Sequence, residues 1–401
     1  MYEVPPTAGL PLRWQDLLPG RGDRLAAGLE ALTGLTVQIE CSGTACLVLA
    51  LNALRTRSRR SRVVIPAYTC PLVPLAIRHA GLQVELCDLA PGHYDFSPDA
   101  LDAVCGPDTL AVIPTHLGGR VADVAGALRI AGHAGASVVE DAAQALGARS
   151  GDRPVGTLGD AGFFSLAVGK GLTTFEGGVL VARNSLLGEA VRVEGARLTR
   201  RQSLIEIRRS LELLAYAASY NPFALTMTYG WPLRHRLRRG NLLAAVGDDL
   251  NGNIPLHRVS AFRLAIAGRA LDRLQAFHEC LEIQARDRCA QLQALPGVRV
   301  LADAPGDRGV WPLLMVLMPG VVERDAVLAD LWGSGLGVGR MFLHAVPDYP
   351  YLKQVVPAVD VPNARSFAAR MLTVSNSPWL DEARFATVLA SIGAAAQRGH
   401  Y

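Results

Sequence analysis

The sequence predicts an α/β protein, with a mainly parallel central sheet covered by helices and a smaller C-terminal α+β region. Between residues 47 and 140, short apolar runs typical of buried strands alternate with runs of helical periodicity. This alternation is the pattern of parallel strands joined by crossover helices. A chain of 401 residues that is 50% hydrophobic can also bury a large core, and it is long enough for two domains.

The order of the expected elements follows from this pattern. The expected strands comprise residues 62–66, 83–87, 110–114 and 137–140, and the expected helices comprise residues 47–54, 72–80, 98–105 and 121–134. An amphipathic run over 255–295 is expected as one long linking helix, and helices are expected at 324–332 and 381–393. We therefore expect a large cofactor-binding domain, residues 1–252, and the linking helix with a small C-terminal domain, residues 253–401.

Lysine is rare in this chain, since only Lys170 and Lys353 occur among its 40 basic residues. Lys170 follows an apolar run and precedes the Gly177-Gly178 pair and a second apolar run at 179–181. A primary amine can lose its proton and condense with an aldehyde, which a guanidinium cannot do. The layout predicts a Schiff-base lysine at position 170. An ordinary surface lysine is the alternative, and it describes Lys353 well.

Two further features fit a cofactor that forms a Schiff base. Asp141 ends an expected strand, and in open parallel sheets ligands bind at the carboxyl ends of strands. A carboxylate there is the partner that the ring nitrogen of pyridoxal phosphate requires, although Asp141 read alone could be a helix cap. Ser42, Gly43 and Thr44 open an apolar helix, whose free N–H groups and dipole bind phosphate. An ordinary helix start is the alternative there.

Together these residues resemble a known family, the DegT/StrS-type aminotransferases, which are pyridoxal-phosphate enzymes of fold type I. The resemblance covers most of residues 36–400 and keeps the order and nearly the spacing of the family's motifs. They lie at residues 42–44, 65–69, 114–119, 140–148, 159–165, 170 and 176–178.

The resemblance implies a role for each site residue. Lys170 would form the internal aldimine with pyridoxal 5'-phosphate and later move the proton, and Asp141 would face the pyridine nitrogen. Gln144 would hydrogen-bond near the ring hydroxyl, and Ser165 would hold the phosphate together with the backbone at 43–44. Asn253 is similar to a family asparagine that reaches the phosphate of the neighbouring subunit, which implies a homodimer with shared sites.

Three positions depart from the family pattern. Cys70 stands where the family commonly has an aromatic residue that stacks on the cofactor ring. Pro255 stands where a basic residue is often found, and Met341 aligns with a frequent histidine near the substrate. The cofactor core is therefore intact by this comparison, whereas the substrate-facing part is unusual.

The function implied by the resemblance is transfer of an amino group from an amino acid, plausibly L-glutamate, to a ketone. The expected acceptor is a nucleotide-linked keto-sugar in polysaccharide or natural-product biosynthesis. The departures leave two alternatives: a lipid-linked or carrier-bound ketone, and a catalytically silent homologue that acts as a binding or scaffold protein. Retention of Lys170 argues against the dehydrating members of the family, which generally replace this lysine.

One segment, residues 197–239, stands apart from this pattern. It holds nine arginines against two acids, a net charge of +7, while the whole chain carries +4. Between the arginine clusters lies an apolar, aromatic stretch broken at Asn221-Pro222. We weigh three interpretations: a helical hairpin at a dimer interface, a lid over an anionic substrate, and a surface that contacts an anionic membrane.

Composition and motif content argue against several other classes of protein. No run has the roughly 20 apolar residues of a membrane span, and the start lacks a signal-peptide pattern, so we expect a cytoplasmic protein. The seven cysteines include no Cys-x-x-Cys pair and the histidines show no ligand spacing, so we expect neither a disulfide framework nor a metal site. The arginine clusters match no nucleic-acid-binding motif.

Overall fold

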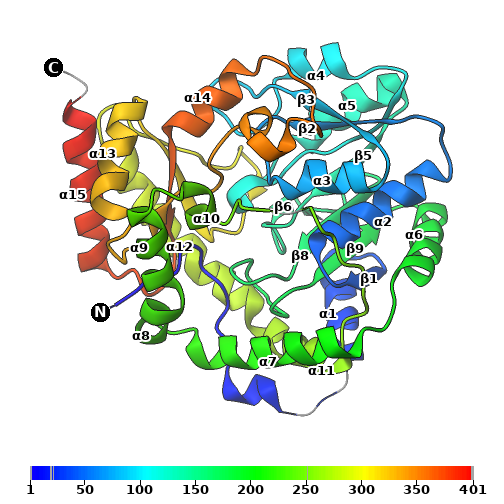
Figure 1. Ribbon diagram of the computed structural model, residues 1–401, viewed down its shortest axis with the longest axis horizontal. Helices are drawn as coiled ribbons and strands as arrows, with labels where there is room; N and C mark the ends of the chain where they lie inside the picture. The colour runs from blue at the N-terminus through cyan, green and yellow to red at the C-terminus, as the bar shows by residue number, and fades with distance from the viewer. Residues whose placement is uncertain (1, 19, 21, 251, 399–401) are drawn as a thin grey trace.

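The computed structural model describes residues 2–18, 20, 22–250 and 252–398, and its centre is a seven-stranded sheet (Figure 1). Its strands are β1 (Val37–Glu40), β2 (Arg62–Pro66), β3 (Gln83–Cys87), β4 (Thr109–Val112), β5 (Ser137–Asp141), β8 (Ala161–Ser165) and β9 (Gly178–Ala182). Their order is β1-β9-β8-β5-β4-β2-β3. All neighbouring strands from β3 to β8 are parallel, and only β9 and β1 add antiparallel pairings. The predicted fold class is confirmed.

Helices cover both faces of this sheet. They are α1 (Asp23–Thr33), α2 (Gly43–Arg55), α3 (Leu72–His79), α4 (Pro98–Val104), α5 (Val124–Ala134) and α6 (Ser185–Leu198). Val63 and Ile65 of β2 share a core cluster with residues of α2 and α3, whereas Val64 shares one with residues of α4 and α5. Alternate side chains of a strand point to opposite faces, so a strand buried on both faces reads as a continuous apolar run. For this reason β2 and β3 begin and end where the sequence predicts.

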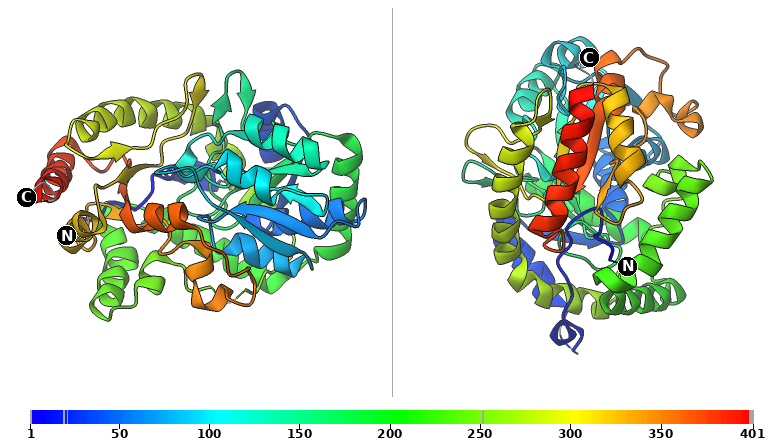
Figure 2. Two further views of the ribbon diagram at one scale, coloured as in Figure 1. Left: turned by 90° about the horizontal axis from the view of Figure 1, so that it is seen from above. Right: turned by 90° about the vertical axis from the view of Figure 1, so that its left-hand side faces the viewer.

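A second sheet lies in the C-terminal part of the chain. It consists of β10 (Arg299–Val300), β12 (Leu313–Leu317), β13 (Val338–Gly339) and β14 (Met371–Ser375), all antiparallel. The helices α13 (Val321–Leu331) and α15 (Glu382–Arg398) share its core cluster, and α14 (Pro362–Arg370) leads into β14. Figure 2 shows α13 and α15 gathered at one end of the molecule, beside the N-terminal segment. The division at residues 252 and 253 stays a prediction.

A small sheet joins distant parts of the chain. Its strands β6 (Arg149–Ser150), β7 (Arg153–Pro154) and β11 (Asp307–Arg308) are two residues long, and β11 pairs with β6. Two residues are too few to show an alternating pattern in the sequence, so these strands are recognised only by their pairing partners.

The prediction of one long helix over residues 255–295 is wrong in two respects. Residues 255–260 are not helical: His257 forms an isolated bridge with Arg200, and the N–H of Arg258 donates a hydrogen bond of 3.1 Å to the carbonyl of Arg200. The helical part is then divided into α11 (Ala261–Ala270), a 3-10 turn (Leu271–Arg273) and α12 (Leu274–Gln293). In the 3-10 turn, the guanidinium of Arg273 donates a hydrogen bond of 3.1 Å to the carbonyl of Pro11.

The basic segment 197–239 is largely helical. It contains α7 (Ser203–Ser219), α8 (Pro222–Leu225), a π-helical turn (Thr226–Gly230) and α9 (Trp231–Arg238), and α10 (Leu242–Val246) follows it. Leu204, Ile207 and Leu211 form an exposed apolar stripe on α7. Within the described part of the chain, no helix combines the length and the apolar content needed to cross a membrane.

Candidate active site

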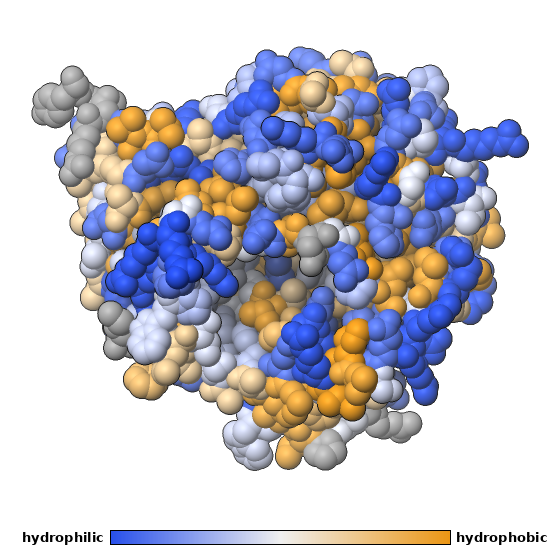
Figure 3. All heavy atoms as spheres, viewed as in Figure 1, coloured by the Kyte–Doolittle hydropathy of each residue, from blue (hydrophilic) through white to orange (hydrophobic). Residues whose placement is uncertain are grey.

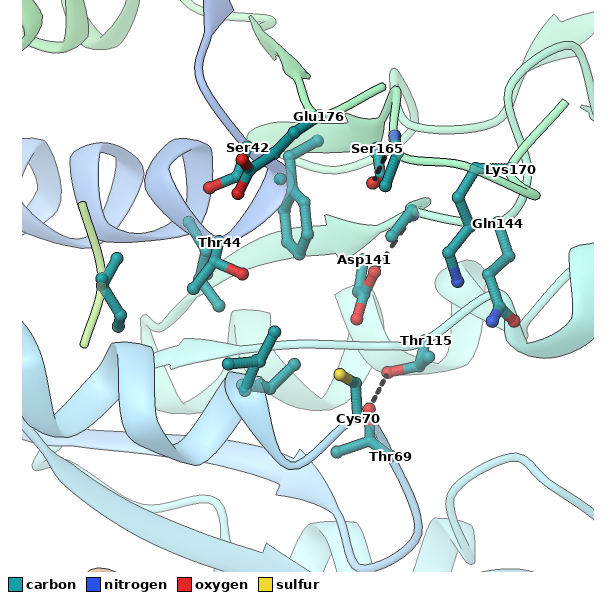
Figure 4. Close-up of a pocket in the computed structure, with 18 of the residues that line it drawn as sticks. Ser42, Thr44, Thr69, Cys70, Thr115, Asp141, Gln144, Ser165, Lys170 and Glu176 are labelled. Carbon is teal, nitrogen blue, oxygen red and sulfur yellow. Dashed lines mark hydrogen bonds between the residues drawn. The ribbon is translucent and has the colours of Figure 1, made fainter. Parts of the chain in front are cut away.

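A cavity of about 280 Å³ lies at the carboxyl ends of the parallel strands (Figure 4). In that view Lys170 and Gln144 enter from one side and Thr44 from the other, with Asp141 between them. All the residues that the sequence analysis assigned to a cofactor line this cofactor cavity: Ser42, Gly43, Thr44, Asp141, Gln144, Ser165, Lys170 and Asn253.

The N-terminus of α2 forms one end of the cavity. Ser42 is the N-cap residue, and its Oγ accepts a hydrogen bond of 3.0 Å from the N–H of Ala45. The N–H groups of Gly43 and Thr44, in the first turn, have no carbonyl partner within a helix. These donors and the positive end of the helix dipole suit a phosphate group.

Ser165 ends β8 beside this helix terminus. Its Oγ accepts a hydrogen bond of 3.2 Å from the N–H of Ala167, which leaves the hydroxyl hydrogen available for a ligand. The glycine at 178 permits the close packing behind this wall, because a Cβ there would lie 2.4 Å from the carbonyl of Ser42. The end of α2 and the end of β8 can therefore approach each other closely enough to share one ligand group.

Asp141 and Lys170 form the ionisable pair of the cavity. Oδ1 of Asp141 accepts a hydrogen bond of 3.1 Å from the N–H of Ala143. Burial raises the pKa of Asp141, which that N–H and the charge of Lys170 partly counteract. Burial lowers the pKa of Lys170, and the nearby Cys70 and Asp141 oppose the shift. The neutral, nucleophilic amine of Lys170 is therefore reached at lower pH than that of an ordinary lysine.

The amide of Gln144 has a defined orientation. Its Oε1 accepts a hydrogen bond of 2.7 Å from the N–H of Gly118, which has a left-handed backbone (φ 60°) that favours glycine. Because the oxygen is held, the Nε2 hydrogens remain to donate to a ligand. The resemblance implies that Gln144 lies near a ring hydroxyl, and a donor is the group that such an oxygen needs.

His116 lies at the floor of the cavity within a buried network. Its Nδ1 accepts a hydrogen bond of 3.0 Å from the N–H of Ala122, so we assign its hydrogen to Nε2, 3.1 Å from Glu140 Oε2. Glu140 also accepts hydrogen bonds of 2.6–2.8 Å from three backbone N–H groups at 156–159. Both ring nitrogens of His116 therefore have partners within the protein.

The departures from the family pattern also lie near the cavity. Cys70 lines it, and burial raises the pKa of its thiol to about 11. Asn253 and Pro255 also line the cavity, and the contact of Asn253 with the phosphate of a neighbouring subunit stays a prediction. Near the aligned position 341, it is Phe342 that lines the cavity.

The sequence analysis assigned no site role to several other lining residues. Thr69 and Thr115 follow β2 and β4, and their hydroxyl oxygens lie 3.3 Å apart. Glu176 also faces the cavity. All three residues lie in the motifs that carry the family resemblance. Ligands bind at the ends of parallel strands, so the position of Thr69 and Thr115 after two such strands could have identified them as site residues.

The fold and the cavity define a pyridoxal-phosphate-dependent protein of fold type I. The particular family follows from comparison: the chain belongs to the DegT/DnrJ/EryC1/StrS aminotransferase family. The sequence profile of that family matches residues 23–205. The chain is also 32% identical over 324 residues to the GDP-perosamine synthase of Caulobacter vibrioides, which is 80% of this chain and 76% of that protein. Its cofactor is therefore pyridoxal phosphate.

Two further relatives define the extent of the similarity. The chain is 33% identical over 178 residues to a UDP-N-acetyl-3-dehydro-alpha-D-glucosamine 3-aminotransferase of Acidithiobacillus ferrooxidans. This match is 44% of the chain and spans about half, 48%, of that relative. The structure of the putative sugar aminotransferase Spr1654 from Streptococcus pneumoniae in its PLP form shares the fold. Its TM-score is 0.73 at 16% identity, over 99% of each chain.

Proposed function

We propose that the protein is an aminotransferase that moves an amino group from L-glutamate to the ketone of a nucleotide-linked sugar. The observation that supports this most strongly is the meeting of Lys170, Asp141 and the N-terminus of α2 in one cavity. An amine, a carboxylate and a phosphate-binding helix end are the three groups that pyridoxal phosphate needs.

The residues present fit the cofactor. The α2 terminus with Ser165 would hold its phosphate, Asp141 would face its ring nitrogen, and Nε2 of Gln144 would donate to its ring oxygen. When bound, the cofactor supplies an electron sink for a carbanion. Nζ of Lys170 would take the proton from the donor's α-carbon as a general base and return it as a general acid.

The acceptor is inferred from the relatives. Two of the relatives are named for UDP- and GDP-linked sugars. A third, from Bacillus subtilis, is a spore coat polysaccharide biosynthesis protein, 27% identical over 85% of this chain. A keto-sugar nucleotide for polysaccharide or natural-product synthesis is the acceptor that these names support. A homodimer with shared sites and a cytoplasmic location stay predictions.

The absorption spectrum of the purified protein tests the function. We expect a yellow band that borohydride fixes onto Lys170 and that L-glutamate bleaches to the pyridoxamine form. Lys170→Ala should lose both responses, while Lys353→Ala, the matched control, should keep them. A protein that stays colourless with added pyridoxal phosphate would contradict the proposal and favour the silent homologue.

A further inference from the structure

A second cavity, of about 480 Å³, lies against the loop that holds Lys170. Gly169 and Phe175 line this second cavity, while the next residues along the chain, Lys170 and Glu176, line the cofactor cavity. One loop therefore separates the two spaces. Figure 3 shows that the face bearing α7, α9 and α10 is hollowed at its centre, with hydrophobic side chains inside the hollow.

The family profile matches residues 23–205. The other walls of the second cavity come from two segments outside that region. One is the N-terminal stretch 5–7, and the other comprises residues 212–229 of α7 and the turns after it. Both are anchored beside the lysine loop: the N–H of Leu10 donates to the carbonyl of Gly171 (3.0 Å), and the N–H of Gly9 donates to the Tyr220 hydroxyl (3.0 Å). The wall of the second cavity is therefore shared between the lysine loop, which lies inside the matched region, and two segments that lie outside it.

The lining is apolar and aromatic. It includes Val168, Phe175, Tyr216, Tyr220, Leu225 and Tyr229. Among the described residues, Glu212 is the one charged side chain that lines it, and Arg208 and Arg209 pair with that carboxylate at 2.9 and 2.8 Å. A lining without an arginine or lysine gives a phosphate no counter-charge, so the space suits an uncharged group.

One polar group in this lining remains for a ligand. The Tyr216 hydroxyl is buried and lies near that of Tyr220, whose hydrogen bonds go to Gly9. Within the described residues it makes no well-aligned hydrogen bond. The neighbouring Tyr220 hydroxyl is its polar contact, and a ligand with an oxygen or nitrogen at its edge would give it a further hydrogen-bond partner.

We propose that the second cavity is the subsite for an uncharged, largely apolar group of the ketone acceptor, remote from the reacting carbon. This inference rests on the proposed function, because it assigns the cavity to the same acceptor. The group could be the base of a nucleotide or the alkyl chain of a lipid carrier, since both present an uncharged surface to tyrosine rings.

Calorimetric titration of the pyridoxal-phosphate-loaded full chain tests the subsite without turnover. The probes are uridine for a base, n-hexyl β-D-glucoside for an alkyl chain, and methyl β-D-glucoside as the probe lacking both. We expect uridine or the hexyl glucoside to bind at least about 10-fold more tightly than the methyl glucoside, and the tighter one identifies the source.

Two variants of α7 complete the test. Ala215 is exposed and lines the second cavity, so Ala215→Trp should fill it and weaken the tighter probe about 10-fold or more. Ala218 is exposed on the same helix and does not line the cavity, so Ala218→Trp should bind as the wild type does. Ser219→Trp replaces Ala215→Trp if the latter does not fold.

Two results would overturn the subsite: neither probe binds more tightly than methyl glucoside, or Ala215→Trp binds as Ala218→Trp does. The glutamate response of the absorption band is recorded on the same samples. If the glutamate response is absent while a probe still binds, the proposed function is refuted and the affinity of the second cavity is not. The failure of the function and the failure of the subsite are therefore distinguishable.

Discussion

The guanidinium of Arg209 lies 2.5 Å from the carboxylate of Glu176, which joins α7 to the wall of the cofactor cavity. Both side chains are about one-quarter exposed. In Figure 4, Glu176 lies beside Ser42, at the end of the cavity assigned to the phosphate. Part of the positive charge of the segment 197–239 therefore neutralises a carboxylate that would otherwise repel a phosphate.

Arg209→Gln should weaken pyridoxal-phosphate binding. Without its partner, the Glu176 carboxylate repels the cofactor's phosphate in a partly buried place, and we expect the Kd to rise about 5-fold. Equilibrium titration of the apoprotein by absorbance measures this. The effect should shrink at high salt, because screening weakens the repulsion.

The double variant Arg209→Gln/Glu176→Gln should restore the affinity, since it removes the repelling charge as well. Arg208→Gln is the matched control, because Arg208 pairs with Glu212 and is 76% exposed. If the double variant binds as weakly as Arg209→Gln, the effect is not electrostatic.

Gln144→Leu should alter the spectrum of the bound cofactor. The change removes the Nε2 donor that we propose faces the ring oxygen, while the N–H of Gly118 loses its acceptor. We expect the absorption band to shift and the apparent pKa of the chromophore to change, measured by a pH titration of the spectrum. A titration curve identical to that of the wild type would show that Gln144 does not contact the ring oxygen.

Lys170 of the apoprotein should react with an acylating reagent at lower pH than the lysine of an unstructured model peptide does. Burial lowers the pKa of Lys170, so its neutral form appears as pH rises before that of an ordinary lysine, whose pKa is 10.5. Peptide mass spectrometry of acetylation against pH measures Lys170 and the model peptide side by side. Asp141→Asn should move the Lys170 midpoint lower still, because Asp141 favours the charged amine. Equal midpoints for Lys170 and the model peptide would contradict the lowered pKa of Lys170.

Glu206→Gln should destabilise the fold by loosening α7. Glu206 is buried and contacts Arg263 at 2.6 Å and His257 at 2.9 Å. Burial alone would raise its pKa, but hydrogen bonds from His257, Arg263 and the N–H of Ser260 lower it to about 2. Removal of one member of a buried ionic group costs about 3 kcal/mol in the free energy of unfolding.

The pH dependence of this contribution has a definite sign. Because the folded-state pKa of Glu206 is depressed, its stabilisation is complete above the ordinary value of 4.5 and is lost as pH falls toward about 2. Urea unfolding of both proteins should therefore give a difference at pH 7 that shrinks across this window. Glu189→Gln, which alters an exposed pair with Arg192, should leave the unfolding free energy unchanged.

The sequence predicted the central sheet well because the physical signal there is local. Val63, Val64 and Ile65 are buried on both faces of β2, so the strand appears as an uninterrupted apolar run. The two-residue strands β6, β7 and β11 were not predicted, since their partners lie far away in the chain. The break after Ala270 is not visible in the sequence, because α11 and α12 continue one periodic pattern, and the 3-10 turn Leu271–Arg273 between them appears only in the structure.

The sequence by itself determined the chemical groups of the candidate site: a rare lysine, a carboxylate at a strand end, and a helix start that suits a phosphate. Only the tertiary structure decided that Arg209 reaches Glu176, and that residues 5–10 lie against the lysine loop to enclose a second cavity. The physical reason is the range of the interactions. Strand ends and helix caps are set by neighbouring residues, whereas the walls of a cavity are set by packing between segments whose separation along the chain leaves no periodic trace.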